Sequence, residues 1–159
     1  AIQNSNAYLL LVGTPLFDND HYYNSIIKII ESNSLVHRVI MPGYRDDLEA
    51  MYSAMDLFLY PSLEKDTSPL ALLSAISSGL PVGLSKITSL TEIIDKCNDI
   101  DIFNPKKLNE ISGLMKKYEN DEIRQKSGML NRESGIKYFD ISIHGQKFQR
   151  IIKQNRIGI

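Results

Sequence analysis

The stretch Tyr8-Leu9-Leu10-Leu11-Val12-Gly13-Thr14-Pro15 begins with an apolar run and ends in three turn-forming residues. A short apolar run of this kind, closed by glycine and proline, is typical of a β-strand that is covered on both faces. The next residues, about 21–31, carry apolar side chains at helical spacing on one stripe. A buried strand followed by an amphipathic helix predicts the start of an α/β domain with a parallel sheet.

The same alternation continues along the chain. Further strands are expected over 36–41, 56–60, 81–85 and 101–103. Helices are expected after Asp46 or Asp47 and over 69–78 and 89–95, with Gly79 at the end of the second. From residue 106 onward only helical periodicity remains, over 107–118, 122–138 and 142–154. The prediction is one domain over 1–159: a Rossmann-like parallel sheet of four or five strands, flanked by helices and followed by C-terminal helices.

The composition excludes several classes of protein. Apolar residues make up 43% and charged residues 23%, which is near the average for a soluble globular domain. The net charge of −1 gives no electrostatic reason to expect a nucleic-acid partner. The longest apolar runs are too short to form a transmembrane segment. We therefore expect a domain without nucleic-acid or membrane-spanning function.

The single cysteine and the three histidines limit the cofactors that this chain could hold. Cys97 is the only cysteine, which excludes an internal disulfide and suits a reducing cytosol. The three histidines lack the spacing of metal ligands, so no metal is expected. The chain starts without a signal peptide or an initiator methionine, and it reaches its first strand within a few residues. We therefore expect a cytoplasmic fragment of a longer protein, and that longer protein could lie peripherally at a membrane.

Three loops are candidates for a binding site, because ligands of open parallel sheets bind beyond the carboxyl ends of the strands. These loops span 42–46, 61–69 and 85–91. In the middle loop, Ser68 is suited to cap a helix and Pro69 to take its first position, which would aim free amides at an anionic or hydroxyl-rich ligand. Asp66 supplies a carboxylate suited to sugar hydroxyls. The alternative is that Asp66 and Thr67 only cap and shape a turn.

Several segments together carry a family resemblance. The segments are Val36–Gly43, Asp56–Ser62 and Ser74–Val82, followed by Ser85 and Glu92–Asp95. In order and spacing they resemble the C-terminal domain of the family 4 retaining glycosyltransferases, which have the GT-B fold. The resemblance covers about residues 8–120, and the terminal helices fit it more loosely. It implies that this chain is one half of a GT-B fold.

The resemblance also implies a pocket for a nucleotide-sugar donor and assigns residues to it. The base would lie against the main chain of Gly43, Tyr44 and Arg45. The carboxylate that holds the donor sugar falls on Asp66, and the position that binds the ribose falls on Ser74. The donor sugar would contact the segment Asp66, Thr67, Ser68, Pro69 and Leu70. The nucleotide sugar is a substrate, and no other cofactor is implied.

The chain departs from the family pattern at several of these positions. Asp66 is one methylene shorter than the usual glutamate, and Ser74 replaces a second glutamate. Thr67 and Pro69 stand where the family has glycines, and Thr88-Ser89 replaces a double glycine. The arginine and lysine that neutralise the donor diphosphate lie upstream of the segment matching Tyr8. An N-terminal domain, which would bind the unknown acceptor, is also missing from this chain.

Two functions from different classes remain open. In the first, the chain is the donor-binding half of a transferase that moves a sugar with retention; the departing phosphate acts as the base, and no catalytic residue is identified in this chain. The isolated chain is then expected to be inactive. In the alternative, the lost glutamate and glycines mark a degenerate domain that acts as a non-catalytic interaction or scaffold module. Nucleotide binding would separate the two.

Overall fold

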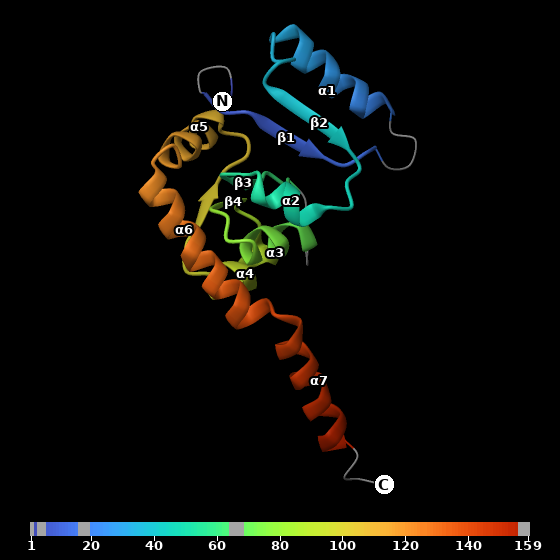
Figure 1. Ribbon diagram of the computed structural model, residues 1–159, viewed down its shortest axis with the longest axis vertical. Coiled ribbons are helices and arrows are strands. Elements are labelled where there is room, and N and C mark those ends of the chain that lie inside the picture. Colours follow the sequence, from blue (N-terminus) through green and yellow to red (C-terminus); the bar gives the residue numbers. More distant parts are fainter. Residues whose placement is uncertain (1, 3–5, 16–19, 64–68, 156–159) are drawn as a thin grey trace.

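The computed structural model describes residues 2, 6–15, 20–63 and 69–155 of the chain, and it has the predicted α/β architecture (Figure 1). Strands β1 (Leu9–Val12) and β2 (Val39–Gly43) form one parallel pair. Strands β3 (Phe58–Tyr60), β4 (Val82–Ser85) and β5 (Ile100–Phe103) form a second parallel sheet in the order β3-β4-β5. The predicted fold class is confirmed, but the five strands form two sheets, because β1 and β3 are not hydrogen-bonded to each other.

Helices connect and cover the strands. They are α1 (Asp20–Ser32), α2 (Leu48–Ser53), α3 (Leu70–Ser77), α4 (Thr91–Lys96), α5 (Leu108–Lys117), α6 (Asp121–Ser134) and α7 (Ile141–Asn155). A 3-10 turn, η2 (Thr88–Leu90), precedes α4, and a π-helical turn, η3 (Gly135–Phe139), joins α6 to α7. Strand β2 begins later than predicted, because residues 36–38 still belong to the turn after α1, where the Arg38 amide donates to the Leu35 carbonyl at 2.8 Å.

The hydrophobic core lies around the three-stranded sheet. Its buried residues are Tyr52, Leu72, Ala75, Ile76, Leu80, Val82, Leu84, Leu90 and Ile93. The central strand β4 is buried at all four positions. Gly83 on this strand is closely packed: a Cβ atom there would lie 2.7 Å from Cδ2 of Leu59 on the neighbouring strand, and that side chain would have to shift. The three-stranded sheet is therefore the packed centre of the domain.

Strand β2 contains an irregularity at Pro42. Leu10 of β1 pairs with Ile40 of β2, and Val12 pairs with Gly43, so β2 has one extra residue between these two pairs. Proline has no amide proton for the ladder and is tolerated at such bulges. Gly43 follows with a φ of 77°, a left-handed conformation that favours glycine. The bulge and the glycine together turn the chain out of the sheet toward α2.

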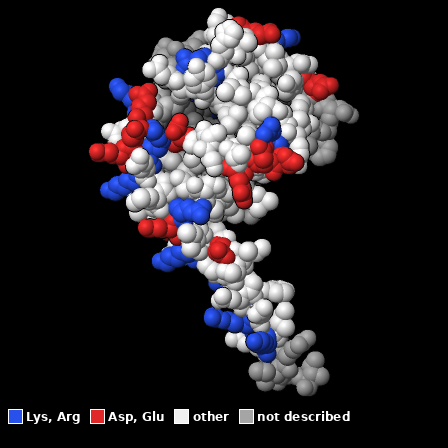
Figure 2. Space-filling model, viewed as in Figure 1, with Lys and Arg blue, Asp and Glu red and all other residues white. Residues whose placement is uncertain are grey.

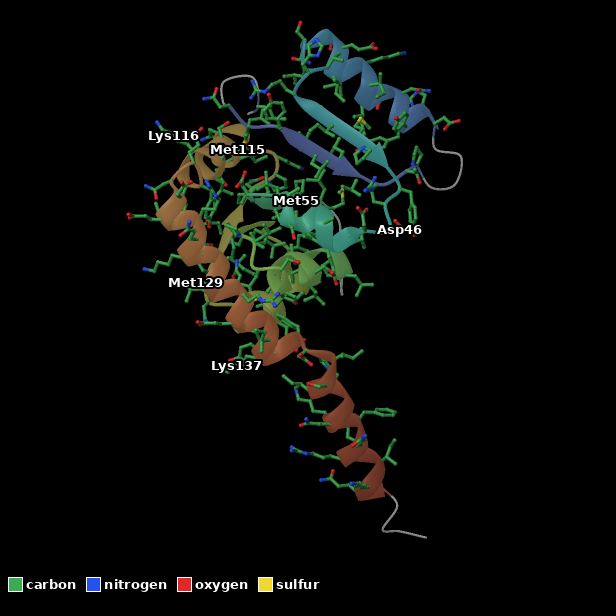
Figure 3. All side chains as sticks on the ribbon, viewed as in Figure 1. Asp46, Met55, Met115, Lys116, Met129 and Lys137 are labelled. Atoms are coloured by element: carbon green, nitrogen blue, oxygen red, sulfur yellow. The ribbon has the colours of Figure 1, made fainter. Side chains whose placement is uncertain are left out.

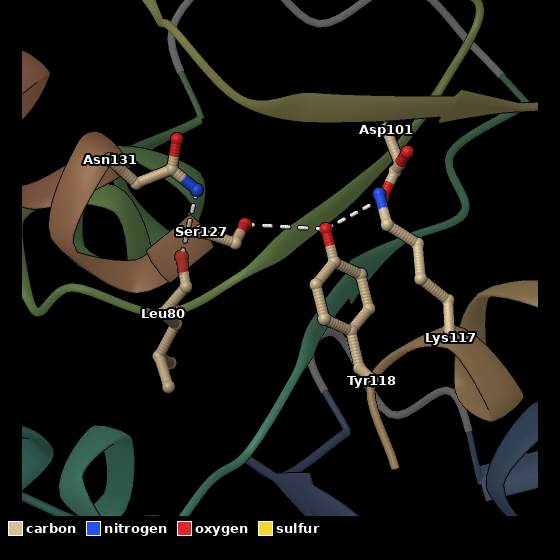
Figure 4. Close-up of polar contacts among 6 residues, drawn as sticks. All are labelled: Leu80, Asp101, Lys117, Tyr118, Ser127 and Asn131. Atoms are coloured by element: carbon tan, nitrogen blue, oxygen red, sulfur yellow. Dashed lines mark hydrogen bonds and ion pairs between the residues drawn. The ribbon is translucent and has the colours of Figure 1, made fainter. Parts of the chain in front are cut away.

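The end of α3 is held against α6. Gly79 (φ 77°) follows the helix; its amide donates to the Ile76 carbonyl at 3.0 Å, and the Leu80 amide donates to the Ala75 carbonyl at 3.1 Å. This pair of bonds is a Schellman motif. From α6, the Asn131 side-chain amide donates to the Leu80 carbonyl at 2.9 Å (Figure 4). The turn that leads from α3 into β4 is therefore held by its own backbone hydrogen bonds and by a hydrogen bond from α6.

A polar cluster connects β5 to the end of α5 and to the middle of α6 (Figure 4). Tyr118 donates its hydroxyl to the Asp101 carboxylate at 2.6 Å, and its oxygen lies 3.3 Å from the Ser127 hydroxyl. The Lys117 ammonium lies 2.6 Å from the same carboxylate. Because Tyr118 is almost fully buried, these bonds satisfy a hydroxyl that would otherwise be costly to bury.

Helix α7 projects away from the rest of the molecule (Figure 1). Its apolar residues Ile141, Phe148 and Ile151 are exposed, and the helix packs against η3. Among the described residues, no helix combines the length and the apolarity that crossing a bilayer would require. The described part of α7 thus adds little to the core.

The contact between α3 and α6 predicts the effect of Gly128→Ala. A Cβ atom at Gly128 would lie 2.3 Å from the Gly79 carbonyl oxygen, so the two segments would have to move apart. We expect a loss of about 1–3 kcal/mol in the free energy of unfolding, measured by urea denaturation. Gly113→Ala is the matched control: it is exposed in α5, has open space around it, and should stabilise by roughly 0.5–1 kcal/mol. Equal stabilities of the two variants would contradict this packing.

The polar cluster predicts a loss of stability at alkaline pH. Burial and then the hydrogen bond to Asp101 raise the pKa of Tyr118 above its usual 10.0. Burial lowers the pKa of Lys117, but its hydrogen bond with Asp101 and the charges of Tyr118 and Asp101 together outweigh burial and raise the pKa above 10.5. Both groups therefore bind their protons more tightly in the folded state, and their stabilising effect is lost as pH rises through these raised values.

We expect the urea midpoint to fall as pH increases above about 10. Tyr118→Phe removes one of the two groups and should make this decline shallower, although the variant itself is less stable at neutral pH. A decline of the same steepness in the variant and the parent would remove Tyr118 from this effect.

Candidate functional site

The loop after β2 is shaped by an ion pair within it. Arg45 lies with Nε 2.7 Å and Nη2 2.5 Å from the two carboxylate oxygens of Asp47. This hydrogen-bonded pairing raises the pKa of Arg45 and lowers the pKa of Asp47. Tyr44 is 76% exposed, and Asp46 lies at the surface of the same loop (Figure 3). Since the guanidinium is already paired, the loop offers a ligand mainly its main chain and the Tyr44 ring.

Helix α2 connects this loop to the loop after β3. The loop runs directly into α2, which carries the buried Tyr52. The Tyr52 hydroxyl donates to the Ala71 carbonyl in the first turn of α3 at 3.2 Å. The sequence marks Tyr52 only as part of a buried stripe, and its hydrogen bond across to α3 could not be predicted from spacing. Through this contact, the predicted nucleotide loop and the start of α3 lie on adjacent, packed elements.

Helix α3 begins one residue later than predicted. Pro69 takes the capping position instead of the first helical position, and its carbonyl accepts from the amides of Leu72 and Leu73 at 3.0 and 3.1 Å. The amides of Leu70 and Ala71 precede these bonds and are the donors at the start of the helix. The predicted cap Ser68 lies outside the described residues, as do Asp66 and Thr67. Their predicted roles remain predictions.

Ser74 lies on the outer face of α3. Its neighbour one turn earlier, Leu70, is 75% exposed, whereas the opposite face, with Leu72 and Ala75, is fully buried. Ser74 is half-buried, and its hydroxyl bonds neither to the Leu70 carbonyl nor to any other described residue. The serine hydroxyl at the predicted ribose position is therefore not occupied by a bond to the helix.

Ser85 organises the end of β3 from the neighbouring strand. It is 1% exposed, and its Oγ lies 2.7 Å from both the Tyr60 and the Ser62 carbonyl oxygens. A hydroxyl has one proton to donate, so it serves these two acceptors alternately. The first residues of the loop that carries Asp66 are thereby attached to β4. The sequence marks Ser85 as part of the resemblance, but not for this contact.

Other candidate groups have structural roles. Glu92 pairs with Lys96 on α4, and this hydrogen bond lowers the pKa of Glu92. A hollow at the carboxyl end of β5 is lined by Lys86, Ile102, Phe103, Asn104, Pro105, Lys107 and Glu110; of these only Lys86 lies in a predicted binding loop, and none was assigned to the donor. Within the part of the chain that the structure describes, no three potential metal ligands of the His, Cys, Asp or Glu type come together.

Comparison with known proteins identifies relatives of this chain. The family described as Glycosyl transferases group 1 matches residues 1–117. An O-antigen biosynthesis glycosyltransferase of Escherichia coli (WclY) is 30% identical over 95 residues, which are 59% of this chain and 27% of the relative. The E. coli UDP-Gal:alpha-D-GlcNAc-diphosphoundecaprenol alpha-1,3-galactosyltransferase is 31% identical over 106 residues, 62% of this chain and 26% of the relative. The chain thus spans about a quarter of the length of these relatives.

Solved structures share the fold. Anabaena HepE, in complex with UDP and glucose, superimposes with a TM-score of 0.82 at 20% identity, over 92% of this chain and 40% of HepE. The sucrose-phosphate synthase of Thermosynechococcus elongatus gives a TM-score of 0.84 at 20% identity, over 99% of this chain and 41% of the synthase. The C-terminal domain of a group 1 glycosyltransferase from Francisella tularensis (LpcC) gives 0.72 at 19% identity, over 84% of this chain and 70% of that domain. Given the family match over residues 1–117, this chain belongs to the group 1 glycosyltransferases, and its fold is the C-terminal half of their GT-B architecture.

Proposed function

We propose that this chain is the donor-binding half of a retaining glycosyltransferase that takes a hexose from a nucleoside diphosphate sugar. The observation that supports this most is the Tyr52–Ala71 contact, which joins α2, the helix that directly follows the loop after β2, to the start of α3. These are the two places where a parallel sheet of this kind binds ligands. The relatives point to the same chemistry: HepE was crystallised with UDP and glucose, and one E. coli relative is named for UDP-Gal.

The nucleotide would bind to the loop after β2. Because Asp47 already neutralises Arg45, the base is recognised by main-chain groups of residues 43–45 rather than by a free positive charge. The exposed Tyr44 ring is available to stack on the base, a contact worth about 1–3 kcal/mol in other base-binding sites. Ser74 would bind one ribose hydroxyl, because its own hydroxyl is not bonded to a described residue.

The donor sugar would bind in front of α3. We expect Asp66 to accept hydrogen bonds from sugar hydroxyls, and the amides of Leu70 and Ala71, at the positive end of the helix, to donate to the same ligand. The proposal needs no protein nucleophile and no metal. The leaving phosphate takes the proton of the acceptor hydroxyl while the glycosidic bond to that phosphate breaks, and the new bond forms on the same face. Groups that neutralise the diphosphate, and the acceptor site, come from the rest of the longer protein.

Two substitutions in the longer protein test these roles. Asp66→Ala should weaken donor binding by roughly 1.5–3 kcal/mol, because it removes a charge-assisted hydrogen bond; Ser74→Ala should cost about 1 kcal/mol. Calorimetric titration with UDP-glucose and UDP-galactose measures both. Glu122→Ala, exposed in the first turn of α6 and outside the segments assigned to the donor, is the matched control and should bind as the parent does. Parental affinity in Asp66→Ala would exclude Asp66 from the donor site.

The same titration, extended to GDP and ADP sugars, distinguishes donor binding from the second candidate function, a non-catalytic interaction module. The observation that favours that function is Ser74, which cannot accept two ribose hydroxyls as a carboxylate does. If the longer protein binds no UDP, GDP or ADP sugar at millimolar concentration, the domain is degenerate and the proposed transferase is wrong.

The 159-residue chain alone should not transfer sugar. On this proposal, the acceptor site and the groups that compensate two phosphate charges belong to the rest of the longer protein, and such electrostatic support usually dominates the stabilisation of a departing anion. Incubation of the purified chain with UDP-glucose and UDP-galactose, followed by chromatography of the released UDP, measures this. Turnover above that of the Asp66→Ala chain would contradict the expectation and place the complete chemistry within these residues.

A further inference from the structure

The ladder between β3 and β4 ends at the last residue of β3. The final pair in this ladder is Tyr60 with Leu84. The next residue of the chain is Pro61, which has no amide proton and therefore cannot donate a further ladder bond to β4. The loop that leads to the segment assigned to the donor sugar thus starts at a residue that cannot extend the sheet.

The side chain of Ser85 makes the connection that Pro61 cannot make. Its Oγ atom lies 2.7 Å from the Tyr60 carbonyl oxygen and 2.7 Å from the Ser62 carbonyl oxygen, so one hydroxyl contacts the residues on both sides of the proline. These distances are typical of good O–H···O hydrogen bonds. Because Ser85 is 1% exposed, bulk water cannot take the place of its hydroxyl.

Ser85 is itself held in place by β5. It pairs with Phe103 in the parallel ladder of β4 and β5, and the amide of the next residue, Lys86, donates to the Phe103 carbonyl at 3.2 Å. Phe103 is almost fully buried, and β4 is buried at all four positions. The hydroxyl that holds the start of the loop is therefore attached to the packed centre of the domain (Figure 1).

A general electrostatic attraction does not replace this positioning. On the face shown in Figure 2, acidic and basic side chains lie intermixed over the domain, apart from α7. The described ion pairs have the same character, since Arg45 pairs with Asp47 and Glu92 pairs with Lys96. Recognition of a sugar hydroxyl then depends on where individual polar groups lie, because hydrogen bonds weaken steeply when their partners are misplaced.

We propose that Ser85 is a positioning residue for the donor sugar, because its hydroxyl fixes the direction in which the loop after β3 leaves the sheet. The inference rests on the proposed donor binding, in which Asp66, four residues after Ser62 in the chain, binds the sugar. The groups assigned to the nucleotide lie elsewhere, in the loop after β2 and at Ser74 on α3, and the described hydrogen bonds of the Ser85 side chain reach neither. Loss of the hydroxyl should therefore weaken binding of the sugar more than binding of the nucleotide.

Calorimetric titration of the longer protein with UDP and with UDP-glucose tests this role. In Ser85→Ala, we expect the Kd for UDP to stay within about twofold of the parent value and the Kd for UDP-glucose to rise at least about fivefold. The ratio of the two constants reports the sugar end of the site. A loss of stability alone would not change this ratio, because UDP binding shows that the variant is folded.

Ser134→Ala is the matched control. Ser134 is also 1% exposed; its Oγ donates to the Leu130 carbonyl at 2.9 Å and accepts from the Asn98 amide at 3.2 Å. It lies on α6, outside the segments assigned to the donor, so its loss should leave the ratio at the parent value. Ser85→Cys keeps a side chain of similar shape with a much weaker donor, and it should raise the ratio as Ser85→Ala does.

Three results would overturn the role of Ser85 while leaving donor binding intact. They are a parental ratio in Ser85→Ala, a parental ratio in Ser85→Cys, and an equal rise of the ratio in Ser134→Ala. If UDP is not the nucleotide, the same comparison uses the GDP or ADP pair that the parent binds. A parent that binds no UDP, GDP or ADP sugar would instead disprove donor binding, and this role with it.

Discussion

The close approach of α6 to the turn between α3 and β4 is the contact on which most of this domain depends. At Gly79 and Gly128 two backbones meet without side chains between them, and a Cβ atom at Gly135 would lie 2.9 Å from Cα of Ser77. Asn131 and Arg132 add hydrogen bonds to main-chain carbonyls of the same turn. This contact fixes where β4 starts, and β4 is the strand around which the core is packed.

Strand β4 also positions the candidate site. At its far end, Ser85 holds the carbonyls of Tyr60 and Ser62, so the loop leading to α3 leaves the sheet in one direction. On the other side, Tyr52 ties α2 to the first turn of α3. The site is thus positioned by hydroxyl-to-backbone bonds, and the charges near it, such as Arg45 with Asp47, neutralise each other. Recognition through main-chain groups is consistent with a ligand whose polar atoms are mostly neutral hydroxyls and base edges.

Much of the fold could be predicted from the sequence, because apolar runs closed by Gly or Pro mark strands whatever their neighbours are. The strand at 82–85 and the end of α3 at Gly79 are confirmed for this reason. The split of the sheet could not be predicted, since periodicity does not tell which strand lies beside Leu9–Val12. The predicted cover on both faces of this strand is also wrong, because all four of its residues are only half-buried. The capping position of Pro69 also differs by one residue, a shift that local propensity does not resolve. Contacts such as Asn131 with Leu80 join residues 51 apart and leave no local pattern.

That separation has a consequence for synthesis on the ribosome. The chain emerges from its amino end, so α3 and β4 are made well before the residues of α6 that close the turn between them. When α3 and β4 have been made, the apolar cluster from Tyr52 to Ile93 is nearly complete, but the Leu80 carbonyl still lacks the Asn131 side chain that binds it in the folded domain. A nascent chain that ends before Asn131 would therefore contain the apolar core without the hydrogen bonds from α6 that close the turn.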